Sequence, residues 1–341
     1  MPATARRRRR PRLKTPPLLY DRTQALIRRI QPQVDGVFLT YWTSPNGSVC
    51  DNDVMALHEV LNALGPQKRL TLFVKSDGGS GMSALRMVHL LRRHCTHLTV
   101  AAPLNCASAA TMLALGADVI LMGPLSYLTA VDTSLEHDLS PVDHTNNLVP
   151  VSNDEVDRVI RLWGETARRN RADVNPYQEL YKYLHPLVIG ALDRASSLSL
   201  MLCREILGYH LKDAKKAEEI SRRLNSSYPA HQYPITSREA RRLGLHVRDL
   251  DAALDGLLQE LNLVYSEMGQ RAITDFDEQN HHDNEITNIL EGGGLQVFYQ
   301  VEKDWHYRKE ERRWVSLNDQ STWYRCRKAR GRLEKAKLHI R

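Results

Sequence analysis

The chain has 341 residues, of which 42% are hydrophobic and 26% are charged, and this balance excludes a disordered, collagen-like or disulfide-stapled chain. Its net charge of +7 is uneven, because residues 1–14 and 303–341 are basic and the residues between them are acidic in sum. The sequence contains no run of about 20 uninterrupted apolar residues, so it predicts no membrane span. Five scattered cysteines without a CxxC pair favour reduced thiols and a cytoplasmic protein.

The first half of the chain alternates between predicted helices and strands. Residues 1–20 are expected to be a disordered basic tail. Apolar residues spaced three and four apart predict helices over 21–31, 54–64, 82–91 and 108–115. Short apolar runs predict strands over 36–42, 70–74, 98–101 and 119–122. This alternation predicts an α/β fold with a parallel sheet covered by helices.

From about residue 150 the chain is predicted to be helical. Amphipathic helices are expected over 187–208, 212–224 and 250–261, and Thr236 has the spacing to Glu239 of a capping box. Residues 269–296 are polar, acidic and rich in glycine, and they are interpreted as a linker. Residues 297–341 hold three of the five tryptophans and are predicted to form a small basic aromatic module.

Two glycines and one serine follow the ends of predicted strands. Paired glycines at Gly78 and Gly79 allow a sharp turn with outward N–H groups. Ser108 lies at the first turn of a helix, whose N-terminus offers unpaired amides. An oxyanion hole with one donor from the glycine turn and one from Ala109 can be built from these parts. The alternatives are a simple helix cap at Ser108 and an ordinary or phosphate-binding turn at the glycines.

A series of sequence blocks extends around these residues. The blocks are Ser76-Asp-Gly-Gly-Ser80, Cys106-Ala-Ser-Ala-Ala-Thr-Met112, Gly116-Ala-Asp118, Met122-Gly-Pro-Leu-Ser126, Val131-Asp132, His185-Pro-Leu-Val-Ile-Gly190 and His231-Gln-Tyr-Pro-Ile-Thr236. In this order they resemble the serine dehydrogenase proteinase family, which is related to signal peptide peptidase A and has the Clp-protease/crotonase fold. The resemblance covers about residues 36–262.

The resemblance implies a serine peptidase domain over 21–268, with repeated β-α units around a parallel sheet and a helical C-terminal part. It implies that Ser108 is the nucleophile of an ATP-independent hydrolase and that Gly78, Gly79 and Ala109 occupy oxyanion-hole positions. It implies no metal and no organic cofactor. Peptide or protein substrates and a homo-oligomer are the expected partners.

The base that would activate Ser108 is left open. A serine hydroxyl needs a general base within hydrogen-bond reach, and the related peptidases use a Ser–Lys dyad or a Ser–His–Asp triad. Lys182 is a candidate base. Asp132 could orient a base or hold its loop, and His231 could instead hold the helical region together.

The sequence departs from the family pattern in the loop next to the serine. The differing positions are Tyr127, Thr129, Ala130 and Thr133. This departure and the missing base favour an alternative, a catalytically silent scaffold with the same fold. An acyl-CoA enzyme is a second alternative, because one fold supports several functions, although the serine block disfavours it.

The remaining predictions concern the basic ends and the histidines. The basic termini could contact nucleic acid or an anionic surface. In the last 45 residues, five aromatic residues alternate with Lys and Arg clusters: Trp305, Tyr307, Trp314, Trp323 and Tyr324. They are compatible with stacking on bases, with inward packing and with docking to an acidic partner. The adjacent His281 and His282 are predicted to be an exposed loop rather than a metal site.

Overall fold

A computed structural model describes residues 11–340 except 133, 145–146 and 171–174. One large sheet forms its centre. The strands of this sheet are β1 (Val37–Thr43), β2 (Gln67–Lys75), β3 (Cys95–Ala102), β5 (Val119–Met122), β9 (Val247–Asp249), β10 (Ala272–Asp275), β11 (Asn280–Gly292), β12 (Leu295–Arg308), β13 (Arg313–Asp319), β14 (Thr322–Ala329) and β15 (Arg332–Leu338). Their order is β15-β14-β12-β11-β1-β2-β3-β5-β9, with β10 paired to β11 and β13 paired to β12.

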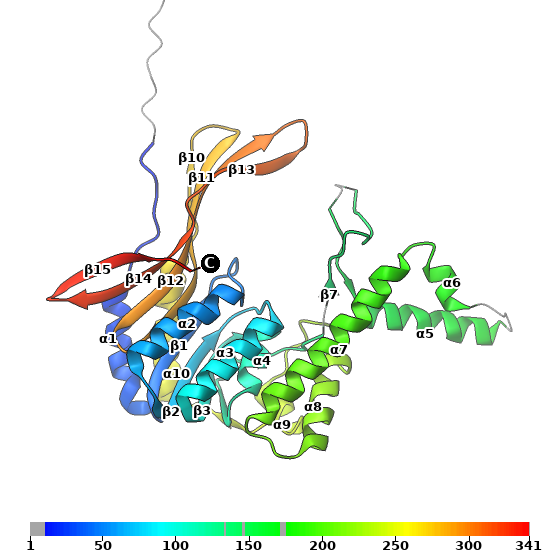
Figure 1. Ribbon diagram of the computed structural model, residues 1–341, viewed down its shortest axis with the longest axis horizontal. Helices are drawn as coiled ribbons and strands as arrows, with labels where there is room; N and C mark the ends of the chain where they lie inside the picture. Colours follow the sequence, from blue (N-terminus) through cyan, green and yellow to red (C-terminus); the bar gives the residue numbers. More distant parts are fainter. Residues whose placement is uncertain (1–10, 133, 145–146, 171–174, 341) are drawn as a thin grey trace, which may run out of the picture.

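Helices cover both faces of this sheet (Figure 1). They are α1 (Tyr20–Ile30), α2 (Asp51–Leu64), α3 (Gly81–His94), α4 (Ala109–Leu115), α5 (Asn153–Arg169), α6 (Pro176–Leu180), α7 (Pro186–Gly208), α8 (Ala214–Ser226), α9 (Ser237–Arg242) and α10 (Ala252–Met268). On one face α2, α3, α4, α7 and α8 share a single apolar core with the strands. On the other face α1 and α10 pack on Phe38, Trp42 and Phe73.

The predicted parallel sheet is confirmed for β1, β2, β3 and β5, which pair in parallel, as does β9 with β5. Helices cover both faces of such strands, so their apolar runs are continuous rather than alternating. Leu70–Val74 in β2 is one such run, and all five of its residues are buried. The predicted helices of the first half lie within α1 to α4 apart from one or two end residues, since Ser108 is the N-cap of α4.

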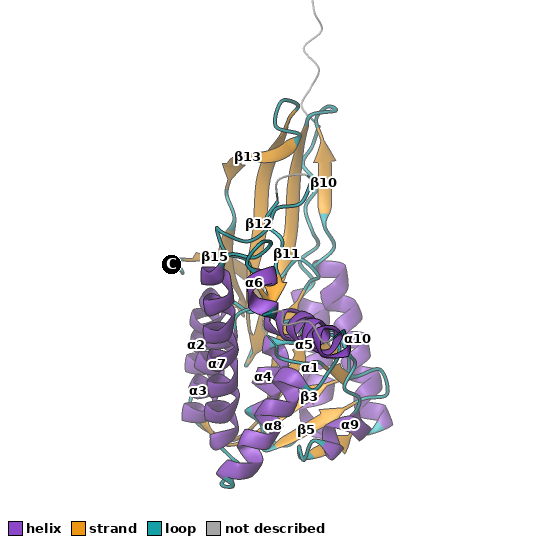
Figure 2. Ribbon diagram, turned by 90° about the vertical axis from the view of Figure 1, so that its right-hand side faces the viewer, coloured by secondary structure: helices purple, strands orange, loops and turns teal. Residues whose placement is uncertain are grey.

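Two arms project from the sheet and its helices (Figure 1). We call β10, β13 and the parts of β11 and β12 that pair with them the strand arm. It is the tall extension in Figure 2. We call α5, α6, the first half of α7 and the two short strands β7 (Ser134–Leu135) and β8 (Val151–Ser152) the helical arm. The helical arm has its own small core around Val156 and Leu184.

Helix α7 joins the helical arm to the main core, where it packs on α3, α4 and α8. By length and composition it is, within the described residues, the one helix that could cross a membrane, with a mean hydropathy of 1.3. A core helix of a water-soluble protein can meet the same criteria, so this finding by itself assigns no membrane span.

The predicted linker at 269–296 is wrong. These residues contain β10 and β11, and β11 pairs with β1 on one side and β12 on the other, in the middle of the sheet. Buried polar side chains of β11 have distant partners: Glu285 accepts hydrogen bonds from Ser44 and Asn46, and Asn288 donates to Asp53. A strand with satisfied buried polar groups has no apolar alternation, which is why its sequence pattern indicates a loop.

The predicted separate module at 297–341 is also wrong. Strands β12, β14 and β15 extend the same sheet, and Val297 and Trp323 belong to the main core. The predicted tail is shorter than expected: residues 1–10 lie outside the described residues, the Lys14 amide donates to Thr274 Oγ1 at 2.9 Å, and Tyr20 already begins α1. Thr236 precedes α9 as expected but makes no side-chain cap hydrogen bond.

The adjacent histidines are not an exposed loop. His281 and His282 lie within β11, where His282 is buried and its Nδ1 lies 2.8 Å from Asp304 Oδ1. Among the residues that the structure describes, no three His, Cys, Asp or Glu side chains gather as a metal site requires.

Candidate active site

Ser108 has a backbone conformation that residues other than glycine rarely adopt. Its φ is 51° and its ψ is −118°, and such a position costs of order 1–3 kcal/mol. The other described non-glycine residues with positive φ are Arg312 and Arg330, and both lie in turns between paired strands. Ser108 lies instead at the start of α4, where its side chain makes no cap hydrogen bond. The simple helix-cap interpretation therefore does not hold.

A chain of hydrogen bonds holds Ser108 in this conformation. The Ser108 amide donates to Thr129 Oγ1 at 2.8 Å. The Thr129 amide donates to Thr111 Oγ1 at 3.0 Å, and Thr111 Oγ1 donates to the Cys106 carbonyl at 2.8 Å. Both threonines are buried. Thr129 therefore directly supports the conformation of the serine.

The glycine turn lies against Ser108. Gly78 has a φ of 107° and Gly79 a φ of 143°. A Cβ on Gly78 would lie 2.6 Å from the Ser108 Cβ, and a Cβ on Gly79 would lie 2.4 Å from the Val49 carbonyl oxygen. Val49 clamps the turn, because its amide donates to the Gly78 carbonyl at 2.7 Å. Both positions therefore require glycine, for conformation and for space.

The backbone N–H groups of the three predicted oxyanion-hole residues differ in whether they already have a hydrogen-bond acceptor. The Gly78 amide donates to Ser76 Oγ at 3.2 Å. Within the described part of the chain, the amides of Gly79 and Ala109 have no hydrogen-bond acceptor. Both residues line one cavity with Ser108. Gly79 and Ala109 are therefore the available donors, and Gly78 is the residue that allows the close approach.

A cavity of about 260 Å³ opens beside Ser108. The glycine turn, Ala109 and Asp132 form its polar side. Its apolar wall is formed by Met82, Met112, Val131, Ala195, Leu198 and Leu202. Three of these wall residues come from α7, so the helical C-terminal part closes a site whose chemistry comes from the first half of the chain.

Asp132 lines this cavity and pairs with His231, which does not itself line it. The Nδ1 of His231 lies 2.8 Å from Asp132 Oδ1, and Asp132 lines the cavity. The hydrogen bond to Asp132 raises the pKa of His231 above its ordinary value. Reciprocal backbone hydrogen bonds between Leu128 and Ile235 bring their two loops together. Sequence reasoning named both residues but did not predict that they pair.

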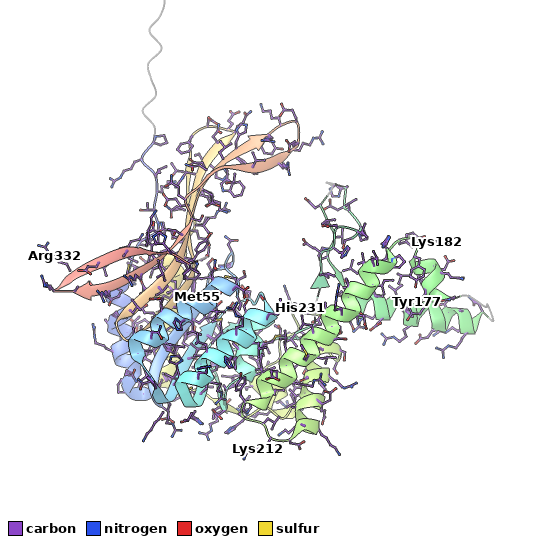
Figure 3. All side chains as sticks on the ribbon, viewed as in Figure 1. Met55, Tyr177, Lys182, Lys212, His231 and Arg332 are labelled. Carbon is purple, nitrogen blue, oxygen red and sulfur yellow. The ribbon has the colours of Figure 1, made fainter. Side chains whose placement is uncertain are left out.

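Lys182 lies away from this cavity. It follows α6 on the helical arm, and Figure 3 places it at the far end of that arm from His231. Its Nζ lies 2.7 Å from Glu179, its side chain is 60% exposed, and the hydrogen bond to Glu179 raises its pKa. A lysine base requires the opposite shift of its pKa. The structure therefore does not bring Lys182 to Ser108.

The comparisons with known proteins give limited similarity. No family model matches the chain. An uncharacterized protein of Methanocaldococcus jannaschii is 26% identical over 187 residues, which is 55% of this chain and 56% of that relative. The chain thus spans little more than half the length of the curated relative it matches.

Two solved structures are also similar in part. One is a serine-to-alanine variant of the 1510-N membrane-bound stomatin-specific protease, with a TM-score of 0.39 and 11% identity over 70% of this chain and 88% of the other. The second is a lysine-to-alanine variant of the same protease with a substrate peptide, with a TM-score of 0.38 and 12% identity over 70% and 83%. Similarity at this level assigns no residue a role in this chain.

Proposed function

We propose that this protein is a serine hydrolase that cleaves peptide bonds through an acyl-enzyme on Ser108. The observation that carries the proposal is the strained, positive-φ serine at a helix start, in contact with a glycine turn. Strain of this kind persists only where the surrounding structure enforces it, and it gathers at functional sites. The free amides of Gly79 and Ala109 and the Asp132–His231 pair supply the other groups that acyl transfer needs.

In the proposed acylation, the Ser108 oxygen attacks the substrate carbonyl and its proton passes to His231 Nε2. Asp132 accepts a hydrogen bond from the Nδ1–H of His231, which leaves Nε2 as the nitrogen with a free lone pair. The carbonyl oxygen becomes an oxyanion that the amides of Gly79 and Ala109 stabilise. The C–N bond then breaks, and the departing amine takes the proton from His231.

In the proposed deacylation, water attacks the ester carbon and gives a proton to His231. The Ser108 oxygen leaves, takes that proton back, and the new carboxylic acid departs. Within the described residues the Ser108 hydroxyl has no hydrogen-bond partner. We therefore expect His231 to approach Ser108 when substrate fills the cavity, since catalytic hydrogen bonds often tighten only in the complex.

The cavity favours an apolar substrate side chain beside the cleaved bond. Its wall carries two methionines, Met82 and Met112, and two leucines, Leu198 and Leu202. Thioether side chains adapt to ligands of different shape. No charged group other than Asp132 lines the cavity among the described residues, and Asp132 is already paired with His231, so a charged substrate side chain would lie there without a free partner.

A fluorophosphonate probe tests the proposed nucleophile. The Ser108 oxygen would displace fluoride from the phosphorus and form a stable adduct that intact-mass measurement detects. We expect stoichiometric labelling of the wild type and none of Ser108→Ala. A matched control is Ser199→Ala, because Ser199 lines the same cavity but its hydroxyl donates to the Val131 carbonyl at 2.8 Å.

The outcomes separate the proposal from its alternative. Labelling of wild type and Ser199→Ala, but not of Ser108→Ala, supports the hydrolase. Equal labelling of Ser108→Ala removes Ser108 as the nucleophile. Absence of labelling in the folded wild type favours a catalytically silent scaffold.

A further inference from the structure

A second cavity, of about 410 Å³, lies on the strand arm. It is lined by Arg271, Ile273, Asp275, His281, Trp305 and Trp314, and we call it the arm pocket. Its residues come from or directly precede strands β10 to β13, which lie side by side in Figure 2. Asp275 pairs with His281 across β10 and β11, and His281 pairs with Trp305 across β11 and β12. Directly paired residues project from the same face of a sheet.

Aromatic rings form the floor of the arm pocket. The His281 ring meets Trp314 edge-on with centroids 4.4 Å apart, and it stacks on Trp305 at 6.5 Å. Tyr307 lies 5.4 Å from Trp314 and extends the cluster. Trp314 is 43% exposed, so the cluster presents an aromatic surface to solvent.

The unpaired charge that lines the arm pocket is negative. The guanidinium of Arg271 donates to both oxygens of Asp283, at 2.7 and 2.6 Å, which neutralises it. The Asp275 carboxylate lines the pocket and has no hydrogen-bond or ion-pair partner among the described residues. Residues 272–302 contain seven Asp and Glu and no Lys or Arg. The unpaired charge in the pocket is therefore that of a carboxylate.

These charges disfavour the nucleic-acid interpretation of the last 45 residues. Phosphates would face Asp275 and the acidic β10–β11 turn. Two aromatic residues proposed for base stacking are also unavailable, because Trp323 is buried in the main core and the Lys335 ammonium covers the Tyr324 ring at 3.8 Å. A base-stacking platform requires open ring faces beside cations.

We propose that the arm pocket binds the guanidinium or ammonium group of an Arg or Lys side chain on a polypeptide. The faces of Trp305 and Trp314 attract a cation through their quadrupoles. Asp275 supplies the opposite charge, and Ile273 contacts the aliphatic stem that such side chains bury. The chemistry at Ser108 plays no part in this binding, so the two proposals succeed or fail separately.

A pair of capped peptides tests the proposal by calorimetric titration of the full chain. One is acetyl-Ala-Arg-Ala-Arg-Ala-amide, and the other replaces each arginine by citrulline, which has nearly the same shape but no charge. Wild type and Ser108→Ala are both titrated, so that cleavage of a peptide is not mistaken for binding. We expect the arginine peptide to bind about tenfold more tightly than the citrulline peptide, because citrulline loses both the cation–π contact and the ion pair; tenfold corresponds to about 1.4 kcal/mol.

Substitutions locate the binding. Asp275→Asn is expected to remove most of the preference for arginine, and Trp314→Ala to weaken arginine-peptide binding roughly tenfold. Both residues are exposed, so the fold should survive, which near-UV circular dichroism checks. Glu310→Gln is the control, since this carboxylate lies in the β12–β13 turn outside the pocket.

Three results would overturn the proposal. They are equal affinity of wild type for the two peptides, an unchanged preference in folded Asp275→Asn, and displacement of the arginine peptide by single-stranded oligonucleotide that binds to the same pocket.

Discussion

The two halves of the candidate site are built differently. On the nucleophile half, Gly78 and Ser108 are in direct contact, and the Ser108 amide is fixed by a buried threonine. On the base half, backbone hydrogen bonds between Leu128 and Ile235 bring two loops together, and the side chains of Asp132 and His231 meet at 2.8 Å. The His231 side chain is 44% exposed, whereas Thr129 is buried.

This difference indicates which part of the proposed chemistry is organised before substrate binds. Groups fixed by the core cost no reorganisation during the reaction, and the nucleophile half has this property. The base half depends on the Asp132–His231 contact to orient the imidazole and on a closer approach of His231 to Ser108. Changes on the nucleophile half should therefore affect both stability and rate, while changes on the base half should affect rate and its pH dependence.

The largest effect is expected from His231→Gln. Removing the proposed general base should slow fluorophosphonate adduct formation by about 10²–10⁴-fold while thermal unfolding stays near that of wild type. Stopped-flow or quenched labelling measures the rate. Lys182→Met is the control, and we expect it to leave the rate unchanged because Lys182 lies on the helical arm, away from Ser108. If Lys182→Met were labelled slowly and His231→Gln at the wild-type rate, the base would be Lys182 and not His231.

Gly78→Ala is expected to combine a rate loss with a stability loss. Its Cβ would lie 2.6 Å from the Ser108 Cβ, at a φ of 107°, so the turn and the serine must separate. We expect adduct formation to fall roughly 10²-fold and the free energy of unfolding to fall by about 2–3 kcal/mol. Urea unfolding and labelling rates measure the two effects.

Gly65→Ala is the matched control for backbone strain. Its φ is 68°, and a Cβ there would meet no atom within 4 Å. The cost should be about 1 kcal/mol, from conformation alone, with an unchanged labelling rate. If Gly65→Ala and Gly78→Ala had the same unfolding free energy and the same labelling rate, the contact between the glycine turn and Ser108 would not contribute to the reaction.

Thr129→Val is expected to have a smaller effect. The substitution keeps the shape of the side chain and removes the acceptor of the Ser108 amide, which then lacks a partner at a cost of about 1–3 kcal/mol. We expect a loss of roughly tenfold in labelling rate, and Thr129→Ser should restore most of it. Val and Ser variants that label equally fast would show that the strained conformation does not depend on this hydrogen bond.

The nucleophile half could be predicted from the sequence because its determinants are local. Paired glycines after one apolar strand and a serine after the next lie at the same edge of a parallel sheet, and each position is marked by its own neighbours. The sequence does not show the strain at Ser108, since a serine before a helix is also an ordinary cap.

The base half and the last strands could not be predicted in the same way. Asp132 and His231 are 99 residues apart, and nothing in the spacing of either loop indicates that Leu128 and Ile235 pair. Strand β11 could not be predicted from the sequence because its buried polar side chains have hydrogen-bond partners far away in the chain. Glu291, for example, accepts hydrogen bonds from Thr23 and Gln24. Such pairings depend on tertiary structure and leave no periodic pattern.

The pH dependence of adduct formation tests most directly whether His231 activates Ser108. The base acts when neutral, and the hydrogen bond to Asp132 raises the pKa of His231 above its ordinary value of 6.5. The rate for wild type should therefore rise with pH and level off only above pH 6.5. Asp132→Asn should move that rise to lower pH, and His231→Gln should abolish it. A rise that persists unchanged in His231→Gln would show that another group accepts the Ser108 proton.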